Sequence, residues 1–145
     1  MDFDRIKALV QDDLELVNRE IRARLQSDVV LISQVGSYIV GSGGKRLRPV
    51  LVLLACRALG YHGKTHVLLA TIIEFIHTAT LLHDDVVDAS ELRRGHSTAN
   101  VIWGNEASVL VGDFLYSRAF EMMVEVNNMR VMDILSHTTN TIAKG

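Results

Sequence analysis

Residues 66–88 read HVLLATIIEFIHTATLLHDDVVD, a mostly apolar stretch that ends in three aspartates. Its first turns carry a single charge, Glu74. Apolar side chains recur at spacings of three and four, which is the pattern of a helix that buries one face. They are Leu69, Ile72, Ile73 and Ile76. We therefore expect a helix over about 66–88 to be the most buried element of the fold.

Composition narrows the class of protein. The chain has 145 residues, 48% of them hydrophobic, a formal net charge of −2, one proline and one cysteine, Cys56. This length fits one domain or part of one. The near-neutral charge argues against a nucleic-acid-binding surface, and a lone cysteine excludes a disulfide framework. No stretch alternates with period two long enough to predict a strand, so the expected class is all-α.

Helical periodicity continues on both sides of the central stretch. One amphipathic helix is predicted over 4–25, and a second helix ends at the glycines of 41–44. Pro49 is expected as the first residue of an apolar helix that runs to Leu59. A long helix over 106–126 is expected to bury Val109, Leu110, Phe114, Leu115 and Met122, and an amphipathic helix should follow over 129–145.

The three aspartates form the first candidate site. Asp84 and Asp88 are four residues apart, so both can face one ligand, and Asp85 lies about a quarter turn round the helix. The carboxylates repel one another, and the helix C-terminus disfavours negative charge. Either Mg²⁺ or the arginine pair Arg93-Arg94 would offset these costs. A solvated acidic helix end held by those arginines is the simpler alternative.

The second candidate site is the loop GSGGKRLRP at residues 41–49. Its glycines let backbone N–H groups approach an oxyanion, and the following helix N-terminus favours an anion. Lys45 and Arg48 are spaced to face the same anion, and arginine suits bidentate contacts with phosphate. A basic surface turn would have the same composition. An acidic metal site, a cationic loop and an apolar helix together indicate an apolar substrate that carries a diphosphate.

Four segments in this order resemble the trans-prenyl diphosphate synthases, most of all the bacterial long-chain members of the octaprenyl diphosphate synthase type. The resemblance covers nearly the whole chain, and is firmest from about Asp28 onward. Its segments are Gly43-Gly44-Lys45-Arg46-Leu47-Arg48-Pro49, Leu81-Leu82-His83-Asp84-Asp85-Val86-Val87-Asp88, Arg93-Arg94-Gly95 and Val111-Gly112-Asp113-Phe114-Leu115. The resemblance implies an all-α isoprenoid-synthase-type bundle. It also implies Mg²⁺-dependent condensation of isopentenyl diphosphate with an allylic diphosphate such as farnesyl diphosphate.

The resemblance also implies a role for individual residues. Asp84 and Asp88 would hold Mg²⁺ on the allylic diphosphate, supported by Asp85, and Arg93 would contact the same diphosphate. The residues implied for isopentenyl diphosphate are Lys45, Arg48, His77 and Arg94. In members of the family that make short products, aromatic residues at the positions of Ala79 and Thr80 stop the growing chain. Here both residues are small instead. A long-chain product, such as a quinone side chain, is therefore expected.

The resemblance spans less than the first half of the family fold. The second aspartate-rich motif and the later diphosphate ligands of the family do not occur in these 145 residues. We therefore expect residues 1–145 to be a partial synthase domain with little activity in isolation. A homodimer is implied by the family. A cytoplasmic location without a membrane span is expected, because the longest apolar run is far shorter than the about 20 residues needed.

Two alternatives lead to different classes of protein. The chain could be a non-catalytic helical partner that works by association, although such a subunit has no need of the acidic and basic motifs. It could also be a metal-dependent phosphohydrolase of the helical His-Asp type, since His83 adjoins Asp84. That reading needs further histidines at the ion, drawn from His62, His66, His77 and His96, and leaves the cationic loop unexplained.

Overall fold

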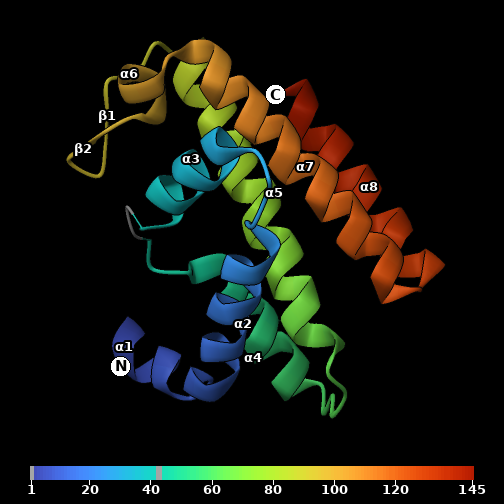
Figure 1. Cartoon of the computed structure of the whole chain (residues 1–145). Coiled ribbons are helices and arrows are strands. Elements are labelled where there is room, and N and C mark those ends of the chain that lie inside the picture. The colour runs from blue at the N-terminus through green and yellow to red at the C-terminus, as the bar shows by residue number, and fades with distance from the viewer. Residues whose placement is uncertain (1, 42–43) are drawn as a thin grey trace.

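The computed structural model describes residues 2–41 and 44–145 and shows helices arranged around one central helix (Figure 1). The central element is α5 (Thr65–Val87), which matches the helix expected over 66–88. It packs most extensively against α7 and also against α2 and α4. The remaining helices are α1 (Phe3–Ala8), α2 (Gln11–Arg24), α3 (Val30–Gly41), α4 (Leu47–Ala58), α6 (Ala99–Trp103), α7 (Asn105–Val126) and α8 (Met129–Lys144). The predicted all-α class is confirmed.

The core lies where α5 meets α2, α4 and α7. Ile72, Phe75 and Leu82 of α5 are at most 2% exposed. Burial of each such side chain contributes about 1.5–3 kcal/mol to folding. They pack with residues of the neighbouring helices that are equally buried, namely Leu14, Val17, Ile21, Leu53, Val111, Leu115 and Met122. The apolar periodicity of the sequence therefore identified the helix around which the fold is built.

The N-terminal prediction of a single helix over 4–25 is wrong, because the chain breaks between α1 and α2. Val10 has φ −122° and ψ 22°, outside the helical region, and its side chain is buried. The guanidinium of Arg57 on α4 donates a hydrogen bond to the carbonyl of Leu9. That bond satisfies a carbonyl that the break removes from the helical ladder. Tertiary contacts thus override a continuous amphipathic pattern.

Three further expectations need correction. Helix α4 begins at Leu47, so Pro49 is its third residue, where a missing N–H is equally harmless. Val109 and Leu110, expected inside, are 39% and 58% exposed on α7. The loop after α5 contains an antiparallel hairpin of β1 (Leu92–Arg93) and β2 (His96–Ser97), too short to show period two in the sequence. Ser42 and Gly43 of the glycine loop lie outside the described residues.

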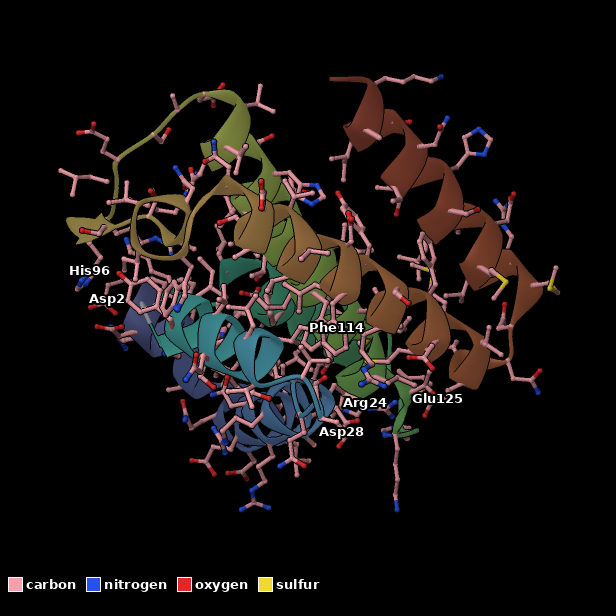
Figure 2. The ribbon with its side chains drawn as sticks, turned by 45° about the horizontal axis from the view of Figure 1, so that its top comes forward. Asp2, Arg24, Asp28, His96, Phe114 and Glu125 are labelled. Atoms are coloured by element: carbon pink, nitrogen blue, oxygen red, sulfur yellow. The ribbon has the colours of Figure 1, made fainter. Side chains whose placement is uncertain are left out.

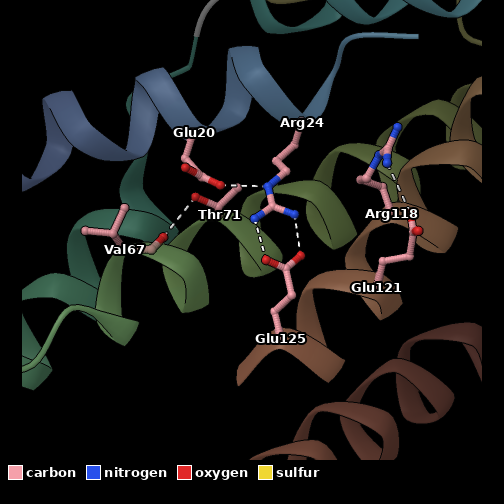
Figure 3. Close-up of polar contacts among 7 residues, drawn as sticks. All are labelled: Glu20, Arg24, Val67, Thr71, Arg118, Glu121 and Glu125. Atoms are coloured by element: carbon pink, nitrogen blue, oxygen red, sulfur yellow. Dashed lines mark hydrogen bonds and ion pairs between the residues drawn. The ribbon is translucent and has the colours of Figure 1, made fainter. Parts of the chain in front are cut away.

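Ion pairs tie α2 to the far end of α7 (Figure 3). Arg24 of α2 forms a two-pronged contact with the carboxylate of Glu125 and also binds Glu20, 2.7 Å from its Nε. Figure 2 shows Arg24 and Glu125 beside each other, with Phe114 farther along α7. The hydrogen bonds that Arg24 donates to Glu125 and Glu20 raise its pKa.

In the part of the chain that the structure describes, α5 alone is long and apolar enough to cross a membrane. Half of its most apolar window is buried against other helices, as in a core helix, so length and composition are weak evidence for a span. The expected lack of a span stays a prediction.

Candidate functional site

The acidic end of α5 is neutralised in part by the hairpin that follows it. Arg93 donates two hydrogen bonds to Asp85, from Nε to Oδ2 at 3.0 Å and from Nη2 to Oδ1 at 2.6 Å. The Asp85 side chain is only 4% exposed, whereas that of Arg93 is 32% exposed. These bonds, together with the nearby Asp84 and Asp88, raise the pKa of Arg93. Arg93, one of the two arginines that the sequence analysis offered as a counter-charge, therefore neutralises Asp85.

Asp84 and Asp88 remain available for a ligand. Both side chains are exposed, and neither forms an ion pair with a residue in the described ranges. They share a face of α5 at a spacing of four, which suits a hydrated divalent cation that takes one or two protein carboxylates. No group of three or more His, Cys, Asp or Glu converges on such a position within residues 2–41 and 44–145. The two carboxylates would thus supply only part of a metal's ligands.

The basic loop is anchored by a buried ion pair that the sequence analysis missed. Arg46 has φ 54° and donates from Nη1 to Oε1 of Glu74 at 3.0 Å, and from Nε to Oδ1 of Asn18 at 3.2 Å. The side chains of Arg46 and Glu74 are 15% and 10% exposed. The signal was present in the sequence, because a lone glutamate in an apolar helix requires a cationic partner.

The four residues expected to bind isopentenyl diphosphate converge. Lys45, Arg48, His77 and Arg94 line one cavity of about 460 Å³, although they come from a loop, two helices and the hairpin. Gly44 lies directly under Arg94: an added Cβ would stand 2.8 Å from Nη1 of the guanidinium. The glycine thus permits a close approach of the arginine to the loop.

His77 is held in its neutral form. Its partial burial, followed by the positive charges of Arg48, Arg94 and Arg93, lowers its pKa to about 4. Nη1 of Arg48 lies 3.4 Å from Nε2 of His77, so a neutral ring can accept a hydrogen bond from the guanidinium there. At neutral pH the cavity therefore presents cations and a neutral histidine, an arrangement that suits an anionic ligand.

An apolar cavity of about 360 Å³ adjoins the basic one between α5 and α8. Arg48 and His77 line both cavities. The other residues that line the apolar cavity are Ile73, Ile76, Thr80, Leu135, Thr138 and Ile142. The charged and the apolar cavity thus share two lining residues, Arg48 and His77.

The two residues predicted to set product length differ in placement. Thr80 lines the apolar cavity, and its Oγ1 donates to the Ile76 carbonyl at 2.9 Å and lies 3.0 Å from the Tyr116 hydroxyl. Ala79 is fully buried. The prediction for both residues stays open, because a role in product length depends on substrate.

His83 supports the packing of α5 on α7 instead of joining a histidine cluster. Its Nε2 lies 3.3 Å from the Val109 carbonyl and 3.4 Å from Oδ1 of Asp113. An added Cβ on Gly112 would stand 2.3 Å from that nitrogen, so any other residue there would force the His83 ring to shift. His66 lies at the opposite end of α5, bound to Asp13 at 3.0 Å. The described residues thus give the phosphohydrolase alternative no support.

Comparisons with known proteins agree with this geometry. A sequence profile described as "Polyprenyl synthetase" matches residues 29–145. Octaprenyl diphosphate synthase of Escherichia coli K12 is 54% identical over 145 residues, and all-trans-nonaprenyl-diphosphate synthase (geranyl-diphosphate specific) of Rhodobacter capsulatus is 46% identical over 147. Both matches cover 100% of this chain but only 45% of the relative.

The structural relatives point the same way. A polyprenyl synthase from Caulobacter crescentus, complexed with calcium and isoprenyl diphosphate, superposes with a TM-score of 0.96 and 50% identity, over 99% of this chain and 44% of that one. A decaprenyl diphosphate synthase from Rhodobacter capsulatus superposes with a TM-score of 0.93 and 50% identity, over 97% of this chain and 44% of that one.

The fold is therefore of the all-α isoprenoid synthase type, as the sequence predicted. The chain belongs to the polyprenyl synthetase family, whose members among these relatives are prenyltransferases that make polyprenyl diphosphates. It spans a little under half the length of the relatives it matches.

Proposed function

We propose that this chain provides the diphosphate-binding part of a trans-polyprenyl diphosphate synthase. Such an enzyme condenses isopentenyl diphosphate with an allylic diphosphate, farnesyl diphosphate or similar, into a long all-trans chain. One observation supports the proposal most strongly: Arg48 and His77 line both the cationic cavity and the apolar cavity. The diphosphate of isopentenyl diphosphate and the prenyl chain of the allylic substrate, which must meet in the reaction, have matching surfaces in these two adjoining spaces.

The residues of the chain divide the work of binding. Lys45, Arg48 and Arg94 would neutralise the diphosphate of isopentenyl diphosphate, and neutral His77 would donate or accept a hydrogen bond there. Asp84 and Asp88 would hold Mg²⁺, which when bound neutralises the departing allylic diphosphate. Positive charge fixed in advance around a leaving diphosphate lowers the barrier to its departure.

The apolar cavity would hold the prenyl chain and exclude water from it. Thr80 lies one turn before Asp84 on the same face of α5, so a chain that starts at the metal passes Thr80 first. Small side chains there leave room for a long product, for which a quinone side chain is our proposed use. A cytoplasmic location and the absence of a membrane span complete this proposal.

A second copy of the chain is the partner that we propose for α7. Val109, Leu110, Phe120 and Val124 are between 39% and 65% exposed on this helix. Phe120 and Val124, together with Tyr116 and Asp113, line a groove of about 550 Å³ there. Exposed apolar patches of this kind mark interaction surfaces. Sedimentation of the wild type and of Phe120→Glu tests the homodimer: a wild-type monomer at all concentrations would contradict it.

Binding and turnover together test the proposed activity. Calorimetric titration of the 145-residue chain with isopentenyl diphosphate should show binding that Arg48→Gln and Arg94→Gln each weaken about tenfold, the loss expected for a charge-assisted contact. Incorporation of radiolabelled isopentenyl diphosphate with farnesyl diphosphate and Mg²⁺ should remain near background, because residues 2–41 and 44–145 supply only part of a metal site. Binding that both variants leave unchanged would refute the assignment of the cavity.

The same incorporation assay separates enzyme from non-catalytic partner. Formation of a long-chain product by the wild type, but not by Asp84→Ala, would show that residues 1–145 suffice for catalysis. It would overturn the expected inactivity of the isolated chain but support the family activity.

A further inference from the structure

We propose that Tyr38 on α3 is a positioning residue, which holds the β1–β2 hairpin so that Arg94 stays in the basic cavity. The Tyr38 hydroxyl donates a 2.7 Å hydrogen bond to the Ser97 carbonyl on β2, across 59 positions of sequence. The inference rests on the proposed function, since Arg94 matters there as a ligand of a diphosphate.

The hairpin has little apolar packing of its own. Leu92 is 66% exposed, and both residues of β2 are exposed. Strands of two residues are marginal without support from another element. The side of the hairpin that faces the helices closes a chamber of only about 30 Å³, lined among others by Tyr38, His77, Asp85 and Arg94. The position of the hairpin therefore depends on a few polar contacts.

Such contacts are spread along the hairpin. At its base, Thr98 donates from Oγ1 to the Ser90 carbonyl at 2.8 Å. On β1, Arg93 is fixed to Asp85. On β2, the Tyr38 bond reaches Ser97, which pairs with Leu92 across the hairpin. Tyr38 thus fixes the second strand to another part of the fold.

Tyr38 is itself held in place. Its ring meets that of Trp103 on α6 edge-on, with centroids 5.1 Å apart. Such a contact limits the orientations of the ring and aims the hydroxyl. A change to phenylalanine keeps this ring contact and removes the hydroxyl that bonds to the hairpin.

Arg94 depends on the orientation of the hairpin because it occupies the turn. It has φ 52° and precedes Gly95 at φ 77°, the two positive values that a tight hairpin turn requires. From there its guanidinium extends over Gly44 and into the basic cavity. A small rotation of β2 would move this side chain away from Lys45 and Arg48. His96, on the other side of the turn, projects outward instead (Figure 2).

A double-mutant cycle tests the inference with inorganic pyrophosphate as the probe. Calorimetry on the 145-residue chain would compare wild type, Tyr38→Phe, Arg94→Gln and the double variant. We expect Tyr38→Phe to raise the dissociation constant about three- to tenfold, the range for one hydrogen bond. The double variant should bind no more weakly than Arg94→Gln alone, because Tyr38 would act through Arg94.

Tyr61→Phe is the matched control. The Tyr61 hydroxyl accepts a hydrogen bond from the Thr65 N–H at the opposite end of α5, so its loss should not affect pyrophosphate. Melting by circular dichroism would record any loss of stability in each variant. A merely structural role for Tyr38 would weaken binding equally with and without Arg94.

The outcomes separate this inference from the proposed function. If Arg94→Gln weakens binding but Tyr38→Phe does not, or does so equally in both backgrounds, the role of Tyr38 is refuted and the diphosphate site stands. If neither Arg94→Gln nor Arg48→Gln changes the affinity, the site itself is refuted, and the inference with it.

Discussion

Arg48 and His77 lie 3.4 Å apart, Nη1 to Nε2, where α4 meets α5, and they line both the cationic and the apolar cavity. The guanidinium always carries its charge, so the pair is favourable only while the imidazole is neutral. Burial and the three neighbouring arginines keep it so, with the pKa of His77 lowered to about 4. The protonation state of His77 therefore affects both the charge of the cavity and the stability of the fold.

We predict that His77 makes the chain less stable as pH falls from about 6.5 to about 4. Its pKa is 6.5 in the unfolded chain and about 4 in the folded one, so in this window the unfolded chain binds the extra proton. Stability then rises with pH and levels off above about 6.5. Allowing for solvent screening, the loss at pH 4.5 is roughly 1–2 kcal/mol.

Urea denaturation at pH 7 and pH 4.5 measures this effect. His77→Gln should remove its share of the pH dependence, whereas His137→Gln, at an exposed position of α8, should not. An equal pH dependence in the wild type and His77→Gln would contradict the prediction.

The buried carboxylate of Asp85 gives a second prediction, because its partner Arg93 can be removed alone. Arg93→Gln would leave Asp85, at 4% exposure, without its charge partner. Breaking a buried pair costs about 3–5 kcal/mol, and the partial exposure of Arg93 reduces this to about 2–3 kcal/mol. Asp85→Asn in addition should restore part of the loss, since the unpaired charge disappears.

Chemical denaturation of the two variants and of Arg130→Gln checks the prediction. Arg130 pairs with Asp133 at the surface, with side chains 79% and 61% exposed, so its removal should change stability by no more than about 0.5 kcal/mol. Equal losses in Arg93→Gln and Arg130→Gln would show that Asp85 does not need its partner.

We predict that Gly112→Ala is costly because α7 approaches His83 there. The new Cβ would stand 2.3 Å from Nε2 of His83, so the ring must leave its contacts with Val109 and Asp113. Overpacking of this kind costs about 1–3 kcal/mol. Gly41→Ala is the control, because a Cβ there meets nothing within 4 Å. A Gly112→Ala variant that melts with the wild type would contradict the close approach.

The sequence predicted the elements of the site better than their supports. Periodicity located α5, and the spacing of charged residues picked out Asp84, Lys45 and Arg48, since these signals are local. The partners were missed because they come from distant segments. Glu74 lies 28 positions after its partner Arg46, and Ser97 lies 59 positions after Tyr38. Nothing in the spacing of either pair shows that they meet.

The errors in the fold have a similar cause. The α1–α2 break follows from the burial of Val10 and from the Arg57 contact on a later helix, neither of which periodicity detects. The exposure of Val109 and Leu110 was also missed. Hydrophobic residues are often buried, but hydrophobicity alone does not show whether another element covers them. Gly112 was correctly expected within a helix, but nothing in its sequence neighbourhood shows that it lies against His83.

The last prediction separates Thr80 from Ala79. Thr80→Phe places an aromatic ring at the wall of the 360 Å³ cavity, so the fold should survive while farnesyl diphosphate loses its apolar contacts. Ala79→Phe adds the same ring at a position with 0% exposure, where overpacking costs about 1–3 kcal/mol or more. Titration with farnesyl diphosphate and with inorganic pyrophosphate distinguishes the two effects. Thr80→Phe should weaken the first ligand and spare the second, whereas Ala79→Phe should lower the melting temperature. If Thr80→Phe weakens both ligands equally, the apolar cavity is not where the prenyl chain binds.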